Sequence, residues 1–188
     1  MVNDADIITK CIEGDRAAQD LLYKMYASLM FGVCLRYCCD RNEAKDVMQD
    51  GFIKVYSNIK NFRKEGSLEG WIKRIIVNTA LDNFKKKQKL YNHTSIDDIN
   101  ELSIEYDEEI EPQDNDITEE ELLAMIQTLP DGYRMVFNLY AIEDYSHKQI
   151  AEMLKITEST SKSQLFKARN ALQKKIYEFQ QQKILVLQ

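Results

Sequence analysis

The sequence predicts an all-α protein in which two small helical domains are joined by an acidic, flexible linker. Its 188 residues include only 6 glycines and 2 prolines, too few for the tight turns of an all-β domain. Apolar side chains recur three and four residues apart in several segments, which is the spacing of amphipathic helices. Charge is also segregated, because residues 91–121 hold 13 acidic side chains and no Lys or Arg.

The charge pattern sets the expected domain boundaries. Residues 1–90 carry a net charge of +4 and residues 122–188 a net charge of +3, although the whole chain carries −6. An acidic stretch of this composition buries too little apolar surface to fold alone. We therefore expect domains at 1–90 and 118–188, with a linker at 91–117. Two interpretations of the linker stay open: a solvated spacer, or a segment whose charge mimics a nucleic-acid strand inside a basic channel.

The first domain is predicted to begin with two helices. A short helix over residues 5–13 stops at Gly14, and Asp15 caps a second helix that continues to about residue 39. Three of the four cysteines fall in or just after this second helix. Their spacing differs from that of zinc ligands, so small buried thiols are the main interpretation, with redox sensing or metal binding as alternatives.

A third helix is predicted to open at Asp40, which with Glu43 resembles a capping box. Its apolar residues follow helical spacing: Ala44, Val47, Met48, Phe52, Val55, Tyr56 and Ile59. The opposite face is polar: Lys45, Asp46, Gln49, Asp50, Lys54 and Asn58.

A loop over residues 61–66 leads to Ser67, which is predicted to cap a fourth helix that runs into the basic residues 85–89. The helix is expected to bury Leu68, Trp71, Ile72, Ile75 and Ile76 and to expose Lys73, Arg74, Asn78 and Asp82. A basic loop with aromatic residues beside a basic helix suits single-stranded DNA, because cations meet phosphates and flat rings meet bases. Both core packing and base stacking remain open for Trp71.

The second domain is predicted to open with capping boxes and short helices. Thr118 with Glu121 begins one helix, Pro130 separates it from the next, and Ser146 with Gln149 begins a third. A turn at residues 155–157 and a long helix from about 158 to 179 follow.

Two helices separated by a tight turn, with the small Ala151 where they cross, indicate a helix-turn-helix. The polar start of the long helix suits contacts with base edges and phosphates in a major groove. An ordinary helical hairpin is the alternative.

Several function classes are disfavoured. No apolar run approaches the roughly 18 residues of a membrane span, and the acidic N-terminus lacks the basic start of a secretory signal, so we expect a cytoplasmic protein without membrane insertion. Glycine-rich phosphate loops, nucleophile turns and catalytic His spacings are missing, so neither an enzyme nor a bound cofactor is expected.

Two regions resemble the extracytoplasmic-function sigma factors of bacterial RNA polymerase, small members of the sigma-70 superfamily. Residues 40–52, DRNEAKDVMQDGF, resemble the polymerase-binding region, and residues 62–75, FRKEGSLEGWIKRI, with 78–82, NTALD, resemble the promoter-melting region. In the second domain, similarity to region 4 lies in LP at 129–130, YRMVF at 133–137, SHKQIAEML at 146–154 and TSKSQL at 160–165. The resemblance extends from about residue 15 to 178, in the family's order.

The resemblance implies partners and site residues. Core RNA polymerase would be bound at its β′ coiled coil and β flap, promoter DNA at its −10 and −35 elements, and an anti-sigma factor is an expected partner. The polymerase-binding residues implied are Asp46, Gln49, Asp50 and Lys54. Those implied for the −10 element, where a base flips into a pocket, are Phe62, Arg63, Lys64, Ser67, Lys73, Arg74, Asn78 and Asp82. Those implied for the −35 element are Ser159, Thr160, Lys162, Ser163, Gln164, Lys167 and Arg169. The linker would thread toward the RNA path of the polymerase.

Three residues depart from the family pattern. Lys155 stands in the turn where Gly is common, so it is expected to carry left-handed strain of roughly 1–2 kcal/mol. Ser161 replaces a usually apolar residue, and Gln164 replaces a frequent Arg. Because Arg reads guanine and Gln reads adenine, the preferred −35 sequence is expected to differ. The other functions that remain open are a DNA-binding regulator independent of polymerase, a helical adaptor that binds only proteins, and an enzyme without a recognisable motif.

Overall fold

The computed structural model describes residues 4–92 and 117–186. These residues form helices and short connections, and no strand occurs among them, so the predicted all-α class is confirmed. The chain divides into two compact units, Met1–Lys86 and Lys87–Gln188, each of which has its own packing. The acidic linker predicted from the sequence, and its proposed path, lie almost entirely outside the described residues.

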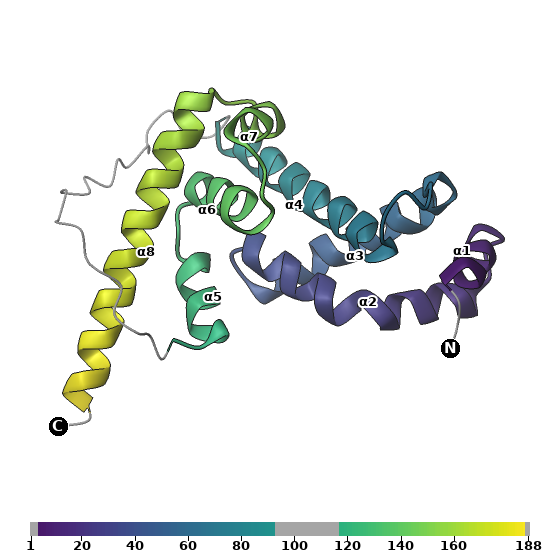
Figure 1. Ribbon diagram of the computed structural model, residues 1–188, viewed down its shortest axis with the longest axis horizontal. Helices are drawn as coiled ribbons and strands as arrows, with labels where there is room; N and C mark the ends of the chain where they lie inside the picture. Colours follow the sequence, from purple (N-terminus) through teal and green to yellow (C-terminus); the bar gives the residue numbers. More distant parts are fainter. Residues whose placement is uncertain (1–3, 93–116, 187–188) are drawn as a thin grey trace. The chain divides into compact units, whose positions relative to one another are not determined.

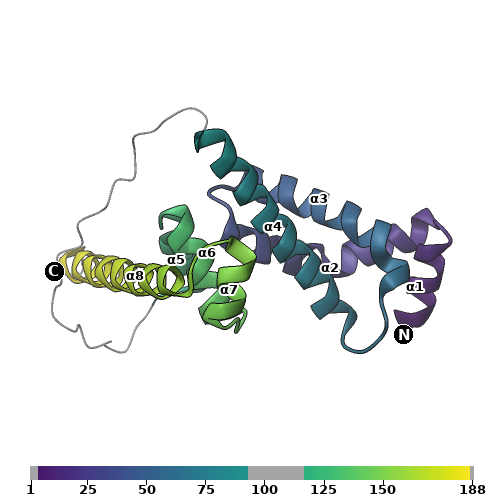
Figure 2. The ribbon, with the colours of Figure 1, turned by 90° about the horizontal axis from the view of Figure 1, so that it is seen from above.

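Residues 4–92 form four α-helices and one short 3₁₀ turn, and the last helix extends a few residues beyond the N-terminal unit (Figure 1). They are α1 (Asp4–Ile12), α2 (Arg16–Tyr37), α3 (Arg41–Asn58), η1 (Ile59–Asn61) and α4 (Leu68–Asn92). α2 packs along α3, and α1 packs against both α2 and η1. Figure 2 shows α3 and α4 lying alongside each other.

The helix starts predicted in this unit are largely confirmed. The Asp15 carboxylate accepts from the backbone N–H groups of Ala17 and Ala18, and the Asp40 carboxylate caps α3 in the same way. Glu43 differs from the predicted capping box. Its two carboxylate oxygens accept from the Cys39 backbone N–H at 3.1 Å and from the Asn83 side-chain amide at 2.7 Å. Glu43 therefore ties the start of α3 to α4.

The apolar face predicted for α3 is the buried face. Ala44, Val47, Phe52 and Val55 are each at most 3% exposed. Gly51 is also buried, because a Cβ at this position would lie 2.4 Å from Cδ1 of Ile76 on α4. On α4, Leu68, Ile72 and Ile76 are buried as predicted, whereas Trp71 and Ile75 are only half-buried. The buried face also includes residues that were not predicted: Val77, Ala80, Leu81 and Phe84.

The C-terminal unit consists of α5 (Glu119–Gln127), α6 (Asp131–Phe137), the π-helical turn η2 (Asn138–Ile142), α7 (His147–Leu154) and α8 (Glu158–Val186). Both predicted capping boxes are present, at Thr118 with Glu121 and at Ser146 with Gln149. α8 packs on α5, α6 and α7 over a core of Ile126, Leu129, Ala168 and Leu172.

Two features of this unit differ from the prediction. α8 continues beyond residue 179, and Lys183 on the added turns lies 3.3 Å from the Glu121 carboxylate of α5. The turn η2 is not predicted by the sequence. It extends α6 directly and carries Tyr140 toward α7, where it contacts His147.

Arg134 is a buried cation that fastens α5 to α6. It is 2% exposed, and its Nη1 donates to the backbone carbonyls of Gln127 at 3.1 Å and Leu129 at 3.0 Å. Its Nη2 donates to the Asp131 carboxylate. The guanidinium thus satisfies carbonyl groups at the end of α5 that helix geometry leaves without intrahelical partners.

We expect Arg134→Met to destabilise the C-terminal unit by about 2–3 kcal/mol, because buried carbonyls lose their charged donors while the volume stays similar. Thermal denaturation of the full chain, followed by circular dichroism, measures this effect. The control Arg63→Met removes an exposed guanidinium and is expected to change stability by less than about 0.5 kcal/mol. Equal effects of the two substitutions would contradict a structural role for Arg134.

Candidate protein and nucleic-acid interfaces

The polar face of α3 is presented to solvent because the opposite face of the helix is buried. Asp46, Gln49 and Asp50 are exposed, as predicted. Lys54 is half-buried, and its Nζ lies 3.1 Å from Oδ2 of Asp82 on α4. The sequence assigned Lys54 and Asp82 to different sites, and the structure brings them together. Because both side chains are partly exposed, this ion pair contributes little to the stability of the fold.

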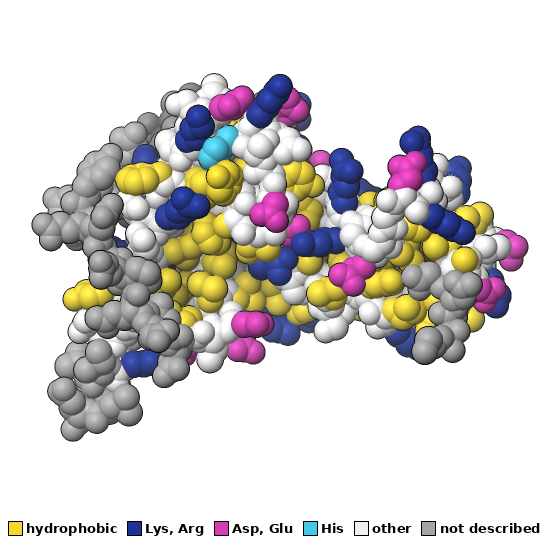
Figure 3. Space-filling view, viewed as in Figure 1, with side chains coloured by type: hydrophobic (Ala, Val, Ile, Leu, Met, Phe, Trp, Pro, Cys, Tyr) yellow, Lys and Arg dark blue, Asp and Glu magenta, His cyan; other side chains and the backbone are white. Residues whose placement is uncertain are grey.

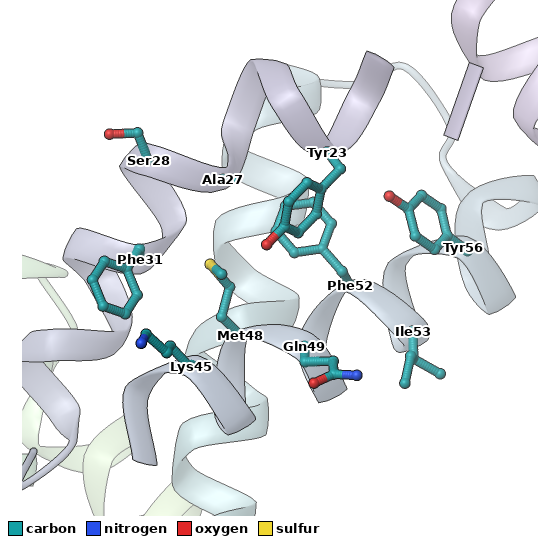
Figure 4. A pocket seen from close by; sticks show the side chains of 10 residues that line it. All are labelled: Tyr23, Ala27, Ser28, Phe31, Lys45, Met48, Gln49, Phe52, Ile53 and Tyr56. Carbon is teal, nitrogen blue, oxygen red and sulfur yellow. The ribbon is translucent and has the colours of Figure 1, made fainter. Parts of the chain in front are cut away.

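A groove beside this face runs between α2 and α3 and has a volume of about 710 Å³ (Figure 4). Tyr23 and Phe52 meet in it edge to face, with ring centroids 4.8 Å apart. The groove lining is mostly apolar and consists of Tyr23, Ala27, Ser28, Phe31, Lys45, Met48, Gln49, Phe52, Ile53 and Tyr56. Ile53 is 57% exposed, although it belongs to an otherwise polar face. The groove could not be predicted from the sequence because its residues have the same helical spacing as core residues.

The loop after α3 forms a second hollow of about 410 Å³. It is lined by Ala5, Ile8, Tyr26, Phe62, Lys64, Gly66, Ser67, Leu68 and Glu69. Lys64 has a φ of 59°, a left-handed conformation that is uncommon for a residue with a Cβ. The Phe62 ring packs at 5.5 Å from the ring of Trp71, which is itself half-buried. Trp71 therefore lies at the edge of the core rather than within it.

One side of α4 continues from this loop. Arg74, Asn78 and Asp82 are exposed and lie four residues apart, so they share one face of the helix. Lys73 is half-buried, whereas Arg63 and Ser67 are exposed in the loop. On the face of the molecule in Figure 3, Lys and Arg side chains lie interspersed with Asp and Glu side chains.

The helix-turn-helix predicted from the sequence is present as α7, a turn and α8. Lys155 adopts the expected left-handed conformation, with φ 58° and ψ 43°. The Ile156 backbone N–H donates to the Ala151 carbonyl at 3.1 Å, which closes the turn. The Thr157 hydroxyl accepts from the Thr160 backbone N–H at 3.0 Å and also bonds the Thr160 hydroxyl. Thr160 is therefore engaged at the start of α8.

The candidate residues on α8 differ in exposure. Ser159, Lys162, Ser163 and Arg169 are exposed, whereas Thr160, Gln164 and Lys167 are half-buried. Gln164 lies against the start of α6, since a Cβ on Gly132 would be 3.1 Å from its Nε2.

Phe166 is a further surface residue of α8 that the sequence analysis missed. It is 50% exposed, and its helical position relative to Ser159 and Ser163 places all three on the outer side. The adjacent Leu165 is 5% exposed and belongs to the core. The sequence signal for an exposed Phe166 is therefore this pair of adjacent apolar residues, because a surface helix buries only one of the two.

A polar and aromatic cluster joins α7 to α8. Nδ1 of His147 and Oγ of Ser161 form a 2.9 Å hydrogen bond, and Ser161 is 0% exposed. Tyr140 stacks on the His147 ring at 4.6 Å between centroids, and Cζ of Arg169 lies 5.8 Å from the Tyr140 ring centroid. Burial, together with the nearby Lys162 and Arg169, lowers the pKa of His147, whereas Glu158 opposes the change. The unusual Ser161 is thereby provided with a partner.

The cysteines are free thiols. Cys11, Cys34 and Cys38 are buried, in keeping with the main interpretation, whereas Cys39 is exposed. Burial raises the pKa of the Cys34 thiol to about 12, so the thiol stays protonated. Within residues 4–92 and 117–186, no three His, Cys, Asp or Glu side chains are grouped as metal ligands. Among the same residues, no helix is long and apolar enough to cross a bilayer.

Comparison with known proteins agrees with both halves of the structure. The family model described as Sigma-70 region 2 matches residues 22–90, and that described as Sigma-70, region 4 matches residues 119–172. The ECF RNA polymerase sigma-E factor of Haemophilus influenzae is 30% identical over 184 residues, which cover 93% of this chain and 96% of that protein. The RNA polymerase sigma-H factor of Pseudomonas aeruginosa is 29% identical over 178 residues, covering 91% and 92%.

A solved structure supports the fold. The sigma factor RpoE of Bartonella quintana, solved in complex with the anti-sigma factor NepR, matches with a TM-score of 0.50 and 17% identity, covering 82% of this chain and 94% of that one. The sequence matches extend across nearly the whole length of the relatives. The chain is therefore a member of the extracytoplasmic-function family of RNA polymerase sigma factors.

Proposed function

We propose that residues 1–90 bind core RNA polymerase and open the −10 element, that residues 118–188 read the −35 element, and that residues 91–117 connect them. One observation carries this division: the two sigma-region matches fall on two separate units, one with an exposed polar helix face and the other with a helix-turn-helix. The polymerase performs the chemistry of RNA synthesis, so no catalytic residue is required of this chain.

The face of α3 is the proposed polymerase-docking surface. Exposed Asp46 and Asp50 suit a basic partner, and their helix is held rigidly by its buried side. Gln49 belongs both to this face and to the lining of the neighbouring groove, where Ile53 adds exposed apolar area. Interfaces of this kind combine an apolar centre with a polar rim. The β′ coiled coil is the proposed partner here, and the β flap is the proposed partner of the C-terminal domain.

The loop hollow and the adjoining face of α4 are the proposed −10 site. Phe62 and Lys64 line a hollow that is large enough for a flipped base. Arg63 in the same loop and Arg74 on α4 are exposed, and we assign them contacts with phosphates. Ser67, Lys73, Asn78 and Asp82 complete the proposed set. Unstacking of a base requires a few kcal/mol, which a lined hollow with aromatic residues offsets.

The outer side of α8 is the proposed −35 reader. Ser159, Lys162 and Ser163 are exposed at the start of the helix, where helix-turn-helix proteins contact base edges. Lys167 and Arg169 are proposed to contact phosphates. Thr160 and Gln164, in the first two turns of the helix, complete the residues proposed to contact the −35 element. Phe166 adds an apolar surface that suits a thymine methyl group.

An anti-sigma factor is a further proposed partner. The Bartonella quintana structure is that of a sigma factor in complex with such a protein. We place the corresponding contact on the groove between α2 and α3, since its occupation would block the polymerase-docking surface. These partners place the proposed activity in the cytoplasm.

The purified chain, added to core RNA polymerase, is expected to start transcripts at promoters that core polymerase alone ignores. Mapping of transcript 5′ ends on a genomic fragment library, with and without the chain, measures this activity. Tight and selective DNA binding by the chain alone, unaffected by core polymerase, would instead support an independent regulator.

Asp50→Lys is expected to weaken binding to core polymerase by about 30-fold, because it places a cation against a basic partner. Fluorescence anisotropy of the labelled full chain, titrated with core polymerase, gives the affinity. Glu13→Lys is the matched control, because it makes the same charge change at an exposed position directly after α1, outside the proposed interfaces. Unchanged binding by the Asp50 variant would remove α3 from the interface.

Phe166→Ala is expected to lower −35-dependent initiation by about five- to tenfold and to relax selection for thymine, because an apolar base contact is lost. Promoter selection from a library with randomised −35 positions gives both quantities. Tyr177→Ala is the control, because Tyr177 is also on α8 and is 47% exposed. If both variants select the same −35 sequences as the wild-type chain, Phe166 does not contact DNA bases.

A further inference from the structure

We propose that His147 links the recognition helix to the DNA backbone, with its Nδ1 bound to Ser161 of α8 and its Nε2–H donating to a phosphate that flanks the −35 element. The proposal rests on the −35 role proposed above for the C-terminal domain. It adds a contact outside α8, from the first residue of α7.

The first step is the bond between the two helices. Ser161 lies inside the domain with none of its surface exposed, so its hydroxyl requires a partner within the fold. Nδ1 of His147 supplies this partner at 2.9 Å. The bond holds the start of α8 against the start of α7, next to the proposed base-reading residues Lys162 and Ser163. His147 is therefore a positioning residue for the recognition helix.

The second step is the orientation of the imidazole ring. Tyr140 stacks on the ring with an interplanar angle of 22°, which limits its tilt. With Nδ1 bound to Ser161 and one face covered by Tyr140, Nε2 lies on the opposite edge of the ring from the buried bond. His147 as a residue is half-buried, so it is not sealed within the fold.

The third step is the chemistry of the ligand. In helix-turn-helix complexes, the first helix of the motif crosses the DNA backbone while the second enters the major groove. A donor on the first residue of α7 that also contacts α8 is thus placed at the boundary between groove and backbone. Lys162 and Arg169 lie near the imidazole and add positive charge, whereas Glu158 is a nearby negative charge. This surrounding favours an anionic phosphate oxygen, which only accepts hydrogen bonds.

The Ser161 hydroxyl accommodates either protonation state of His147. A hydroxyl both donates and accepts, so it donates to Nδ1 of the neutral Nε2–H tautomer and accepts from Nδ1–H of the imidazolium. Both states keep a proton on Nε2 for the phosphate.

The proposed phosphate contact of His147 depends on pH. Burial and the cations Lys162 and Arg169 lower the pKa of His147 in the free protein, against the opposing effect of Glu158, and Tyr140 faces the ring from η2. A bound phosphate raises this pKa, so binding takes up protons, and affinity increases as the pH falls from the pKa of the bound state toward the lower pKa of the free protein.

The experiment uses the full chain with core polymerase and a promoter duplex that the wild-type holoenzyme selects from a randomised library. Each phosphate around the −35 element is replaced in turn by an uncharged methylphosphonate. The variants are His147→Phe, Ser161→Ala, the double variant, and His147→Asn. The double variant removes both members of the buried hydrogen bond, so its thermal stability is expected to exceed that of His147→Phe alone. His147→Asn keeps a hydrogen-bonding group near Ser161 without reaching the phosphate.

We expect one methylphosphonate to weaken wild-type binding by about fivefold at pH 7.5 and by about tenfold or more at pH 6. On the unmodified duplex, the double variant and His147→Asn are expected to bind about fivefold more weakly than wild type. Both are expected to be insensitive to that one methylphosphonate, while they keep the sensitivity at other phosphates.

Two results would overturn the contact. If the double variant folds and shows the wild-type phosphate profile and pH dependence, His147 acts only within the fold. If wild-type holoenzyme binds the promoter without any dependence on the −35 sequence, the proposed −35 role fails, and the contact fails with it.

Discussion

The close approach of α3 and α4 at Gly51 is the constraint on which the N-terminal interfaces depend. A side chain at this position would clash with Ile76, which is itself fully buried. The contact sets the separation of the two helices, and two polar pairs across the same junction fit that separation: Glu43 with Asn83, and Lys54 with Asp82. The proposed polymerase face on α3 and the proposed −10 face on α4 are thus parts of one rigid surface. A change in helix packing would displace both.

The C-terminal domain achieves a comparable rigidity with buried polar groups. Arg134 fastens the end of α5 to α6 through two carbonyls, and Ser161 joins α8 to α7 through His147. Arg134 and Ser161 both have defined partners, so an alternative arrangement of the short helices would leave a donor or acceptor unsatisfied. Helices of seven to nine residues have limited stability alone, and these directional bonds fix their orientation where apolar burial leaves freedom.

Helix positions and caps were predictable because they are set by residues close together in the sequence. Asp15, Thr118 and Ser146 cap the helices that follow them, as predicted. Lys155 adopts the left-handed conformation expected from its position in the turn. The groove between α2 and α3, the pairing of Lys54 with Asp82, and the contact of His147 with Ser161 join residues distant in sequence. Helical periodicity places a residue on one side of its own helix, but it gives no information about which neighbour meets that side. Phe166 and Ile53 follow the same reasoning, since both are apolar residues that lie on the surface.

The charge of the two domains explains why the proposed function requires a polymerase. Residues 1–90 carry a net charge of +4, and residues 118–188 carry 9 basic and 9 acidic side chains. Each domain therefore neutralises few phosphates, and affinity for DNA depends strongly on the number neutralised. Two domains that each bind DNA weakly can bind a promoter selectively when their separation matches that of the two promoter elements. Once one domain is bound, the other then binds its element at a high effective concentration. The proposed docking of α3 on a large partner would supply a fixed position, so the proposed specificity of each domain for DNA would depend on a protein contact elsewhere in the chain.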